Sequence, residues 1–291
     1  MSEHWSELEP DASFVAALDR ADTRWDRTGN CFVEATRQSA IQGSTSMRTN
    51  WSNRFADACA HLIADHLRAS GGLAGREILP EVNGSSEPKR VFGSTEKKLD
   101  VVVTSPLVGL EASISLKGMN FRDRSSASLN FDKNLTGRIY EMESEFRAVR
   151  SVLPQAYMGG LFFLPVAACL DKKDGASSFA RSVAKLRRLT GRADVYAASE
   201  WHRPDFAAIV LYSCADEEAF TYGSKKELFE RSESIERGVA RVFDIAAPPP
   251  QRGRPRVELT ESIAEWVVRI PRRFAEFGGT AEIEWSDPEP E

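Results

Sequence analysis

The amino-acid sequence predicts a mixed α/β fold in which helices flank a mixed central sheet. Two observations predict it: strand-like segments follow one another between residues 76 and 117, and helix-like and strand-like segments alternate after them. A run of antiparallel strands followed by a crossover helix and a further strand makes a mixed sheet. We expect an N-terminal extension at residues 1–50, a main domain at 51–247, a Pro/Arg linker at 248–258, and a C-terminal helix with an acidic tail at 259–291.

The first half of the chain is predicted to hold one helix and then strands. Apolar residues have helical spacing over residues 51–67, and Ser70-Gly71-Gly72 ends this helix. Strand-like segments follow at residues 76–81, 89–93, 99–104 and 110–117. The last of them, LEASISLK, alternates strictly, so Glu111, Ser113, Ser115 and Lys117 share one face. The SPLVG segment before it can turn the chain into a hairpin.

The second half is predicted to alternate helices with buried strands. Loop-like residues 118–134 lead to a helix at 136–153, for which Thr136 is a plausible N-cap. Apolar runs at 160–168 and 205–212 are typical of buried strands. Further helices are predicted at 177–189, 228–243 and 260–274, with three prolines at 248–250 separating the last two.

Composition excludes several classes of protein. Apolar residues make up 42% of the 291 and charged residues 28%, as in globular proteins. No apolar run approaches the roughly 18 residues of a membrane-spanning helix, and the acidic N-terminus is unlike a secretory signal. Cys31, Cys59, Cys169 and Cys214 lie far apart, which argues against a zinc finger or a disulfide scaffold. We expect a cytoplasmic protein with no membrane partner.

The charge of the chain is unevenly distributed. The net charge is −5, but residues 1–11 and 280–291 carry only acidic charges, nine in all. Residues 12–279 therefore have a net charge of +4. A mildly basic body between acidic ends is compatible with a phosphate-binding surface.

Two residues on neighbouring predicted strands suggest a chemistry. Asp100 stands inside an apolar strand, where a carboxylate is costly to bury unless it meets a metal, a cation or water. If residues 105–109 form a hairpin, Asp100 and Lys117 can share one edge of the sheet. Carboxylate oxygens can hold Mg²⁺, and a nearby ammonium group can orient an attacking water. This pattern favours hydrolysis of phosphodiesters, although an ion-paired Asp100 and a solvated Lys117 are the simpler alternative.

The segment KKLDVVVTSPLVGLEASISLKGMNF resembles the active-site hairpin of the PD-(D/E)xK nuclease superfamily. In that family an Asp on one strand is followed by (Asp/Glu)-x-Lys on the next, and Asp100 and Lys117 match these positions. The resemblance covers residues 51–165 and implies a restriction-endonuclease-like core. It also implies an Mg²⁺-dependent endonuclease acting on DNA, with Mn²⁺ as a substitute, in restriction or anti-phage defence. A homodimer or larger homo-oligomer is a further expectation.

The sequence departs from the family pattern at Ser115, which takes the place of the second acid. Some restriction enzymes with Ser-x-Lys supply that carboxylate from the following helix. The resemblance thus makes Glu141 and Glu145, which share a helix face, the candidate metal ligands ahead of Glu143. Glu111 lies about 13 Å from Ser115 along the strand, too far to replace the second acid directly, so it is a candidate for a second metal position or for a cap of the sheet. Ser115 itself is expected to be a small polar neighbour of the site and not a nucleophile.

Arginines in two segments are candidates for DNA contacts. Arg122 and Arg124 belong to the loop that leaves the proposed site. Arg252, Arg254 and Arg256 lie in the segment QRGRPR, which looks like the core of an AT-hook. A basic helix at 177–189 could also contact phosphates, although a solvated helix face is the simpler interpretation.

Two other functions stay open at this point. Ser115 in the position of an acid favours a non-catalytic nucleic-acid-binding or scaffold subunit that keeps the nuclease fold. A nuclease that acts on RNA is the other alternative, since the residues named above do not separate DNA from RNA.

Overall fold

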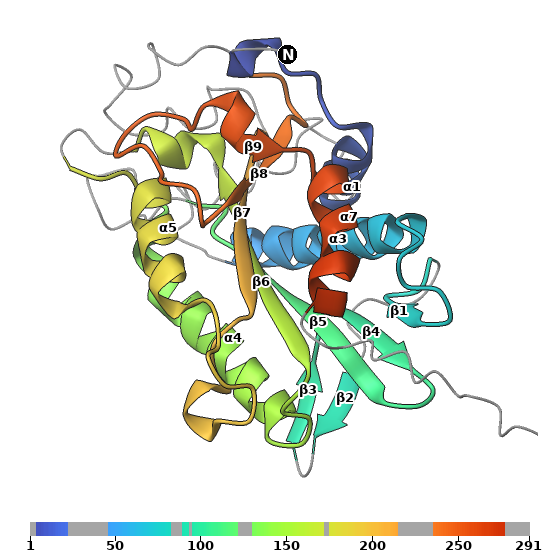
Figure 1. Ribbon diagram of the computed structural model, residues 1–291. Coiled ribbons are helices and arrows are strands. Elements are labelled where there is room, and N and C mark those ends of the chain that lie inside the picture. The colour runs from blue at the N-terminus through green and yellow to red at the C-terminus, as the bar shows by residue number, and fades with distance from the viewer. Residues whose placement is uncertain are drawn as a thin grey trace, which may run out of the picture.

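The computed structural model describes residues 4–22, 46–82, 89–92, 95–121, 130–171, 175–214 and 235–276. Within these ranges the chain forms a mixed α/β fold, as the sequence predicts (Figure 1). None of the helices found there combines the length and the apolar character that a bilayer crossing requires.

A seven-stranded mixed sheet forms the centre of the molecule, in the order β1-β4-β5-β6-β7-β8-β9. Its strands are β1 (Glu77–Leu79), β4 (Val101–Ser105), β5 (Gly109–Gly118), β6 (Tyr157–Pro165), β7 (Phe206–Tyr212), β8 (Ala240–Asp244) and β9 (Thr260–Glu261). Strands β5, β6 and β7 are parallel, and the remaining pairs are antiparallel. A separate ribbon pairs β2 (Lys89–Phe92) with β3 (Thr95–Lys98).

Helices cover both faces of the sheet (Figure 1). One face carries α1 (Ala12–Asp22), α3 (Ser46–Ala69) and α7 (Ile263–Phe274), and the other carries α4 (Leu135–Arg150) and α5 (Ser178–Leu189). On the first face Phe55 of α3 packs on Phe163, with ring centroids 5.5 Å apart. On the second face Phe179 of α5 packs on Phe243 at 5.1 Å. Every residue of β6 and β7 is therefore buried, as their apolar sequences predict.

Two predictions about local structure are wrong. Residues 235–243 are not helical: β8 runs antiparallel to β7, and residues 228–234 lie outside the described part of the chain. Pairing with β7 buries Val242 and Phe243. This burial favours a strand more than the helical spacing of the apolar residues favours a helix. Thr136 is not an N-cap, because α4 begins one residue earlier, after Asn134. The Thr136 hydroxyl instead accepts a hydrogen bond from Lys185 Nζ at 2.7 Å.

Both ends of the described chain pack on the rest of the fold. Helix α1 lies beside α3, and α7 crosses α3 (Figure 1). The segment that resembles an AT-hook is held at three points. The Trp5 indole donates to Pro255 O at 2.8 Å, Gly253 N–H to Cys169 O at 3.0 Å, and Ser177 N–H to Gln251 O at 2.9 Å.

Candidate functional site

The hairpin of β4 and β5 forms the base of the candidate site. Its register pairs Val101 with Ile114 and Val102 with Ser113. Asp100 directly precedes β4, just beyond the last pair of this register. Asp100 Oδ2 accepts a hydrogen bond of 2.6 Å from the Leu116 N–H, which fixes the carboxylate against β5.

Glu145 of α4 contacts β5 at Ser115 and Lys117, on either side of the Leu116 N–H that Asp100 accepts from. One of its carboxylate oxygens accepts a hydrogen bond from Ser115 Oγ at 2.6 Å, and the other contacts Lys117 Nζ at 2.7 Å. The side chains of Lys117 and Glu145 are 9% and 17% exposed, so this ion pair is largely shielded from water. A shielded pair is screened less by salt than one on the surface.

A glycine on β6 lets α4 approach the sheet. Gly160 is the partner of Ser115 across the parallel pair, and it lies beneath Met142 of α4. A Cβ atom at position 160 would stand 2.5 Å from Met142 Sδ, too close for a real contact. Met142 and Phe146 bury one face of α4, and Glu145 lies beside that face, directed at β5. Close packing at Gly160 therefore sets the reach of Glu145.

The other two candidate carboxylates have cationic partners elsewhere. A β-bulge near Val103 leaves Glu111 out of the regular pairing, and its carboxylate binds Arg76. The Arg76 guanidinium lies 5.8 Å from the Phe274 ring centroid, at the α7 side of the molecule. Glu141 is exposed and pairs with Arg138 on its own helix at 2.8 Å. The structure thus brings Asp100, Ser115, Lys117 and Glu145 together, without Glu111 or Glu141.

The structure describes three of the five arginines that are predicted to contact DNA. Arg122 and Arg124 lie outside the described residues. Arg252 is exposed and donates to Gly175 O at 3.0 Å, and Arg256 is exposed and lies 3.5 Å from Glu258. Arg254 is only partly buried.

The basic run of α5 is largely engaged within the fold. Arg181 pairs with Asp132 at 2.5 Å, and Arg187 donates to the Ile245 carbonyl at 2.7 Å. Lys185 donates to Thr136, as described above. These contacts favour a structural role for the helix over a phosphate-binding one.

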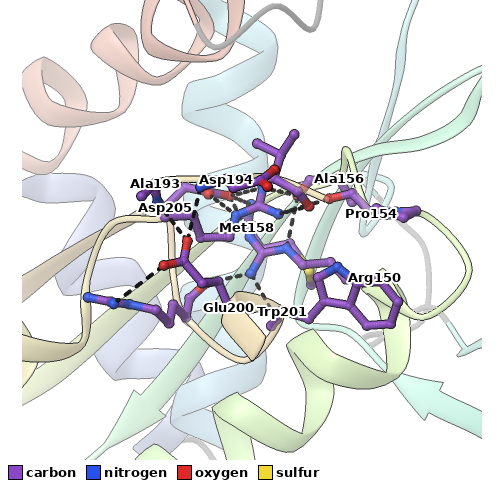
Figure 2. A network of polar contacts seen from close by, with 12 residues as sticks. Arg150, Pro154, Ala156, Met158, Ala193, Asp194, Glu200, Trp201 and Asp205 are labelled. Carbon is purple, nitrogen blue, oxygen red and sulfur yellow. Dashed lines mark hydrogen bonds and ion pairs between the residues drawn. The ribbon is translucent and has the colours of Figure 1, made fainter. Parts of the chain in front are cut away.

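Sequence reasoning missed a buried polar network beyond the end of α4 (Figure 2). Asp205 accepts from Arg150 at 2.5 Å, from Arg192 at 2.6 Å and from the Met158 N–H at 2.7 Å. The side chains of both arginines are fully buried. Arg150 also donates to the Trp201 carbonyl at 3.0 Å, so the network ties residues 192–205 to the start of β6. Asp205, directly before the apolar strand β7, was the sequence signal from which this network could have been predicted.

Burial and pairing act in opposite directions on Arg150. Burial lowers the pKa of its guanidinium to about 10, against the attraction of Asp205. The group is still charged at neutral pH, and the network is therefore a cation–anion–cation triad. Its hydrogen bonds go to protein carbonyls and to one carboxylate, which is typical of a structural site.

The described residues were also compared with the ligand sets that metal ions need. No group of three or more His, Cys, Asp or Glu side chains in those ranges is arranged to hold a metal ion. Compared with models of protein families, with curated proteins and with solved structures, the chain matches none of them.

Proposed function

We propose that this chain is an Mg²⁺-dependent endonuclease of the cytoplasm that hydrolyses DNA phosphodiester bonds, in restriction or anti-phage defence. One observation carries the proposal. Two carboxylates, Asp100 from just before β4 and Glu145 from α4, contact the consecutive residues Ser115, Leu116 and Lys117 of β5. An acid from the following helix thus contacts Ser115, the residue that this sequence has in place of the second acid of the nuclease pattern.

The donor set suits Mg²⁺ better than a metal that needs many protein ligands. Mg²⁺ keeps several of its waters and is commonly held by one or two carboxylates together with substrate phosphates. Asp100 and Glu145 would hold it here. When bound, the ion supplies charge neutralisation at the phosphate and a more acidic water.

The remaining residues of the site position charge. Ser115 donates to one oxygen of Glu145 and fixes the rotation of the carboxylate. Lys117 brings a positive charge to the same acid, and its three N–H donors can also hold a water or a phosphate oxygen. An ammonium at this place favours the negative charge that develops on the phosphate during attack.

A non-catalytic nucleic-acid-binding subunit is the second candidate function. The direct ion pair of Lys117 with Glu145 favours it, because that acid already has a cationic partner. A binding subunit would retain nucleic-acid affinity in EDTA and would cleave nothing in Mg²⁺ or Mn²⁺.

Cleavage assays separate the two candidates. Plasmid DNA and a single-stranded RNA are incubated with the protein in Mg²⁺, Mn²⁺ or EDTA. We expect metal-dependent cleavage of DNA that falls by about a hundredfold or more in Asp100→Asn, which loses a metal ligand, and in Lys117→Ala, which loses a positive charge at the reacting phosphate. Glu141→Gln is the matched control, since it removes an exposed acid of α4, and it should cleave like the wild type.

Binding is measured in parallel by anisotropy with the same DNA. Retained binding in the inactive variants supports the nuclease. Wild-type protein that binds DNA but cleaves neither substrate in any metal supports the binding subunit. Cleavage of RNA alone would overturn the choice of DNA.

A further inference from the structure

A ribbon of two strands, β2 and β3, leads directly into the candidate site. β3 ends at Lys98, two residues before Asp100, and it contacts α4, the helix that carries Glu145 (Figure 1). The ribbon is not part of the seven-stranded sheet. Because a chain spans at most about 3.6 Å per residue, the Cα atom of Lys97 lies within about 11 Å of that of Asp100. The ribbon therefore borders the place where the proposed function puts the scissile phosphate.

The register of the ribbon places two cationic residues on one of its faces. Arg90 stands opposite Lys97, and Phe92 stands opposite Thr95. Residues opposite each other in an antiparallel pair share a face, and so do residues two apart on one strand. These four positions therefore form one face, with two positive charges and no acid among them. The acid of β3, Glu96, belongs to the other face.

This pairing does not favour the stability of the ribbon. Like charges directly opposite each other on two strands are destabilising, and a ribbon of two strands is only marginally stable by itself. A neutral or acidic residue opposite Arg90 would stabilise the ribbon more than Lys97 does. Two cations at paired positions are instead suited to a polyanion, whose phosphates neutralise both charges. The register therefore favours a ligand-binding role of this face over a structural one.

Double-stranded DNA is the polyanion that fits a ribbon best. The major groove of B-DNA is wide enough for a two-stranded ribbon, whereas the major groove of an RNA duplex is deep and narrow. Phosphates follow one another with a rise of about 3.4 Å along each DNA strand. A face within about 11 Å of Asp100 can therefore reach phosphates within about three nucleotides of the scissile one.

We propose that the ribbon face formed by Arg90, Phe92, Thr95 and Lys97 binds the phosphates of double-stranded DNA beside the one that is hydrolysed. Arg90 and Lys97 supply the positive charge, and contacts to phosphates carry no base sequence information. The inference rests on the proposed function for the place of the scissile phosphate. It concerns the binding of DNA and not the metal or the attacking water, so binding and cleavage are measured separately.

The salt dependence of DNA binding tests this assignment. A short DNA duplex and an RNA duplex of the same sequence are titrated with the full-length protein in Mg²⁺ over a series of sodium chloride concentrations. All proteins carry Asp100→Asn, which the proposed function makes inactive, so that the DNA stays intact. The test variant adds Arg90→Gln/Lys97→Gln. The matched control adds Arg188→Gln/Arg272→Gln, which removes the same charge from exposed positions of α5 and α7.

We expect the slope of log affinity against log salt concentration to become less steep by about 2 in the test variant, about 1 for each lost phosphate contact. Its affinity for DNA should fall by about tenfold or more, and the control should keep the parent slope. Without DNA, the test variant should melt at or above the parent melting temperature, because glutamines remove the opposed charges. A structural role of Arg90 and Lys97 predicts the reverse, a lower melting temperature and an unchanged slope.

Three results would overturn the inference: no binding of DNA by the parent protein, an unchanged slope in the test variant, and an equal loss in the control. An RNA duplex that binds as tightly as DNA and shows the same loss would overturn the choice of DNA. A failure of the proposed function is distinguishable, because a protein that cleaves DNA in no metal can still lose salt dependence in the test variant.

Discussion

Contacts at Ser115 decide which carboxylate completes the candidate site. Its hydroxyl donates to Glu145 at 2.6 Å, a distance at which a second carboxylate would repel the first. Compared with the nuclease pattern, the acid is therefore on the helix, at Glu145, and the strand supplies a hydrogen-bond donor, the Ser115 hydroxyl. Exchange of the two side chains is a test of this relation.

We predict that Ser115→Asp alone lowers DNA cleavage and stability, because it sets two carboxylates against each other beside Lys117. The double variant Ser115→Asp/Glu145→Ser restores one acid and one hydroxyl and should recover part of the cleavage lost in Glu145→Ser. Cleavage rates and urea midpoints of all four proteins form a double-mutant cycle. Additive losses in the cycle would mean that the two positions act separately, contrary to this prediction.

Some residues of the candidate site could be predicted from the sequence, and one could not. Asp100, Ser115 and Lys117 follow from the period-2 alternation of β5 and from the hairpin, both visible in the sequence. Glu141 and Glu145 share a helix face and lie one turn apart, so the choice between them depends on the position of α4 along its axis. That position depends on contacts such as Met142 against Gly160, between residues of different elements, which no local pattern encodes.

At the scale of elements, the buried triad of Arg150, Arg192 and Asp205 joins α4, the 192–205 segment and the start of β7 (Figure 2). We predict that Asp205→Asn destabilises the protein by about 3–5 kcal/mol, because two buried guanidinium groups lose their counter-ion. Asp194→Asn, which changes an exposed acid of the same segment, should stay within about 0.5 kcal/mol of the wild type. Urea unfolding followed by tryptophan fluorescence measures both; a loss below about 1 kcal/mol in Asp205→Asn would contradict the prediction.

A second element-scale prediction concerns the start of α7. Ser262 and Glu265 form a capping box, with the Glu265 carboxylate accepting from the Ser262 N–H at 2.8 Å. This hydrogen bond, followed by that of the Ser262 hydroxyl, lowers the pKa of Glu265. A lowered carboxyl pKa stabilises the fold above the unfolded-state value, and the contribution disappears as pH falls through the folded-state value.

We therefore expect Glu265→Ala to cost about 1 kcal/mol at neutral pH, and the difference from the wild type to shrink as the carboxyl becomes protonated in acid. Chemical unfolding across a pH series measures it. Glu258→Ala, an exposed acid outside the cap, should show no such trend. A constant difference at all pH values would assign the effect of Glu265 to packing instead of charge.

Helices and strands whose apolar residues have a regular spacing could be predicted from the sequence. Those that form only because they pair with a neighbouring strand could not. The helices α3, α4, α5 and α7 and the strands β4 to β7 agree with the expected segments to within a few residues. Helix α1 has Phe14, Leu18 and Ala21 on one face, a usable signal in a region assigned no element. The local sequence of β8 is compatible with a helix or a strand. It forms a strand because it pairs with the edge of β7. The two residues of β9 have no pattern of their own.

At the scale of the whole molecule, the last part of the chain is bound into the core that the sequence assigns to residues 51–247. The buried side chains of α7 are Ile263, Trp266, Val267, Ile270, Pro271 and Phe274. Trp266 packs on Phe206 at 5.8 Å and Phe274 on Tyr157 at 5.9 Å, so they cover the start of β6 and β7. At about 1.5–3 kcal/mol for each large apolar side chain, this burial is comparable to the total stability of a typical domain.

We predict that a chain ended after residue 258, without β9 and α7, has no cooperative thermal transition and little near-ultraviolet circular dichroism. A chain ended after residue 276 retains both elements and is the matched control, with a melting temperature close to that of the full chain. Exposure of Tyr157 and Phe206 in the shorter chain should also increase binding of a hydrophobic dye. If the shorter chain melts like the control, residues 259–276 are an appendage. The packing of α7 on α3 and on the sheet argues instead that both faces of the sheet must be covered before any part of this fold is stable.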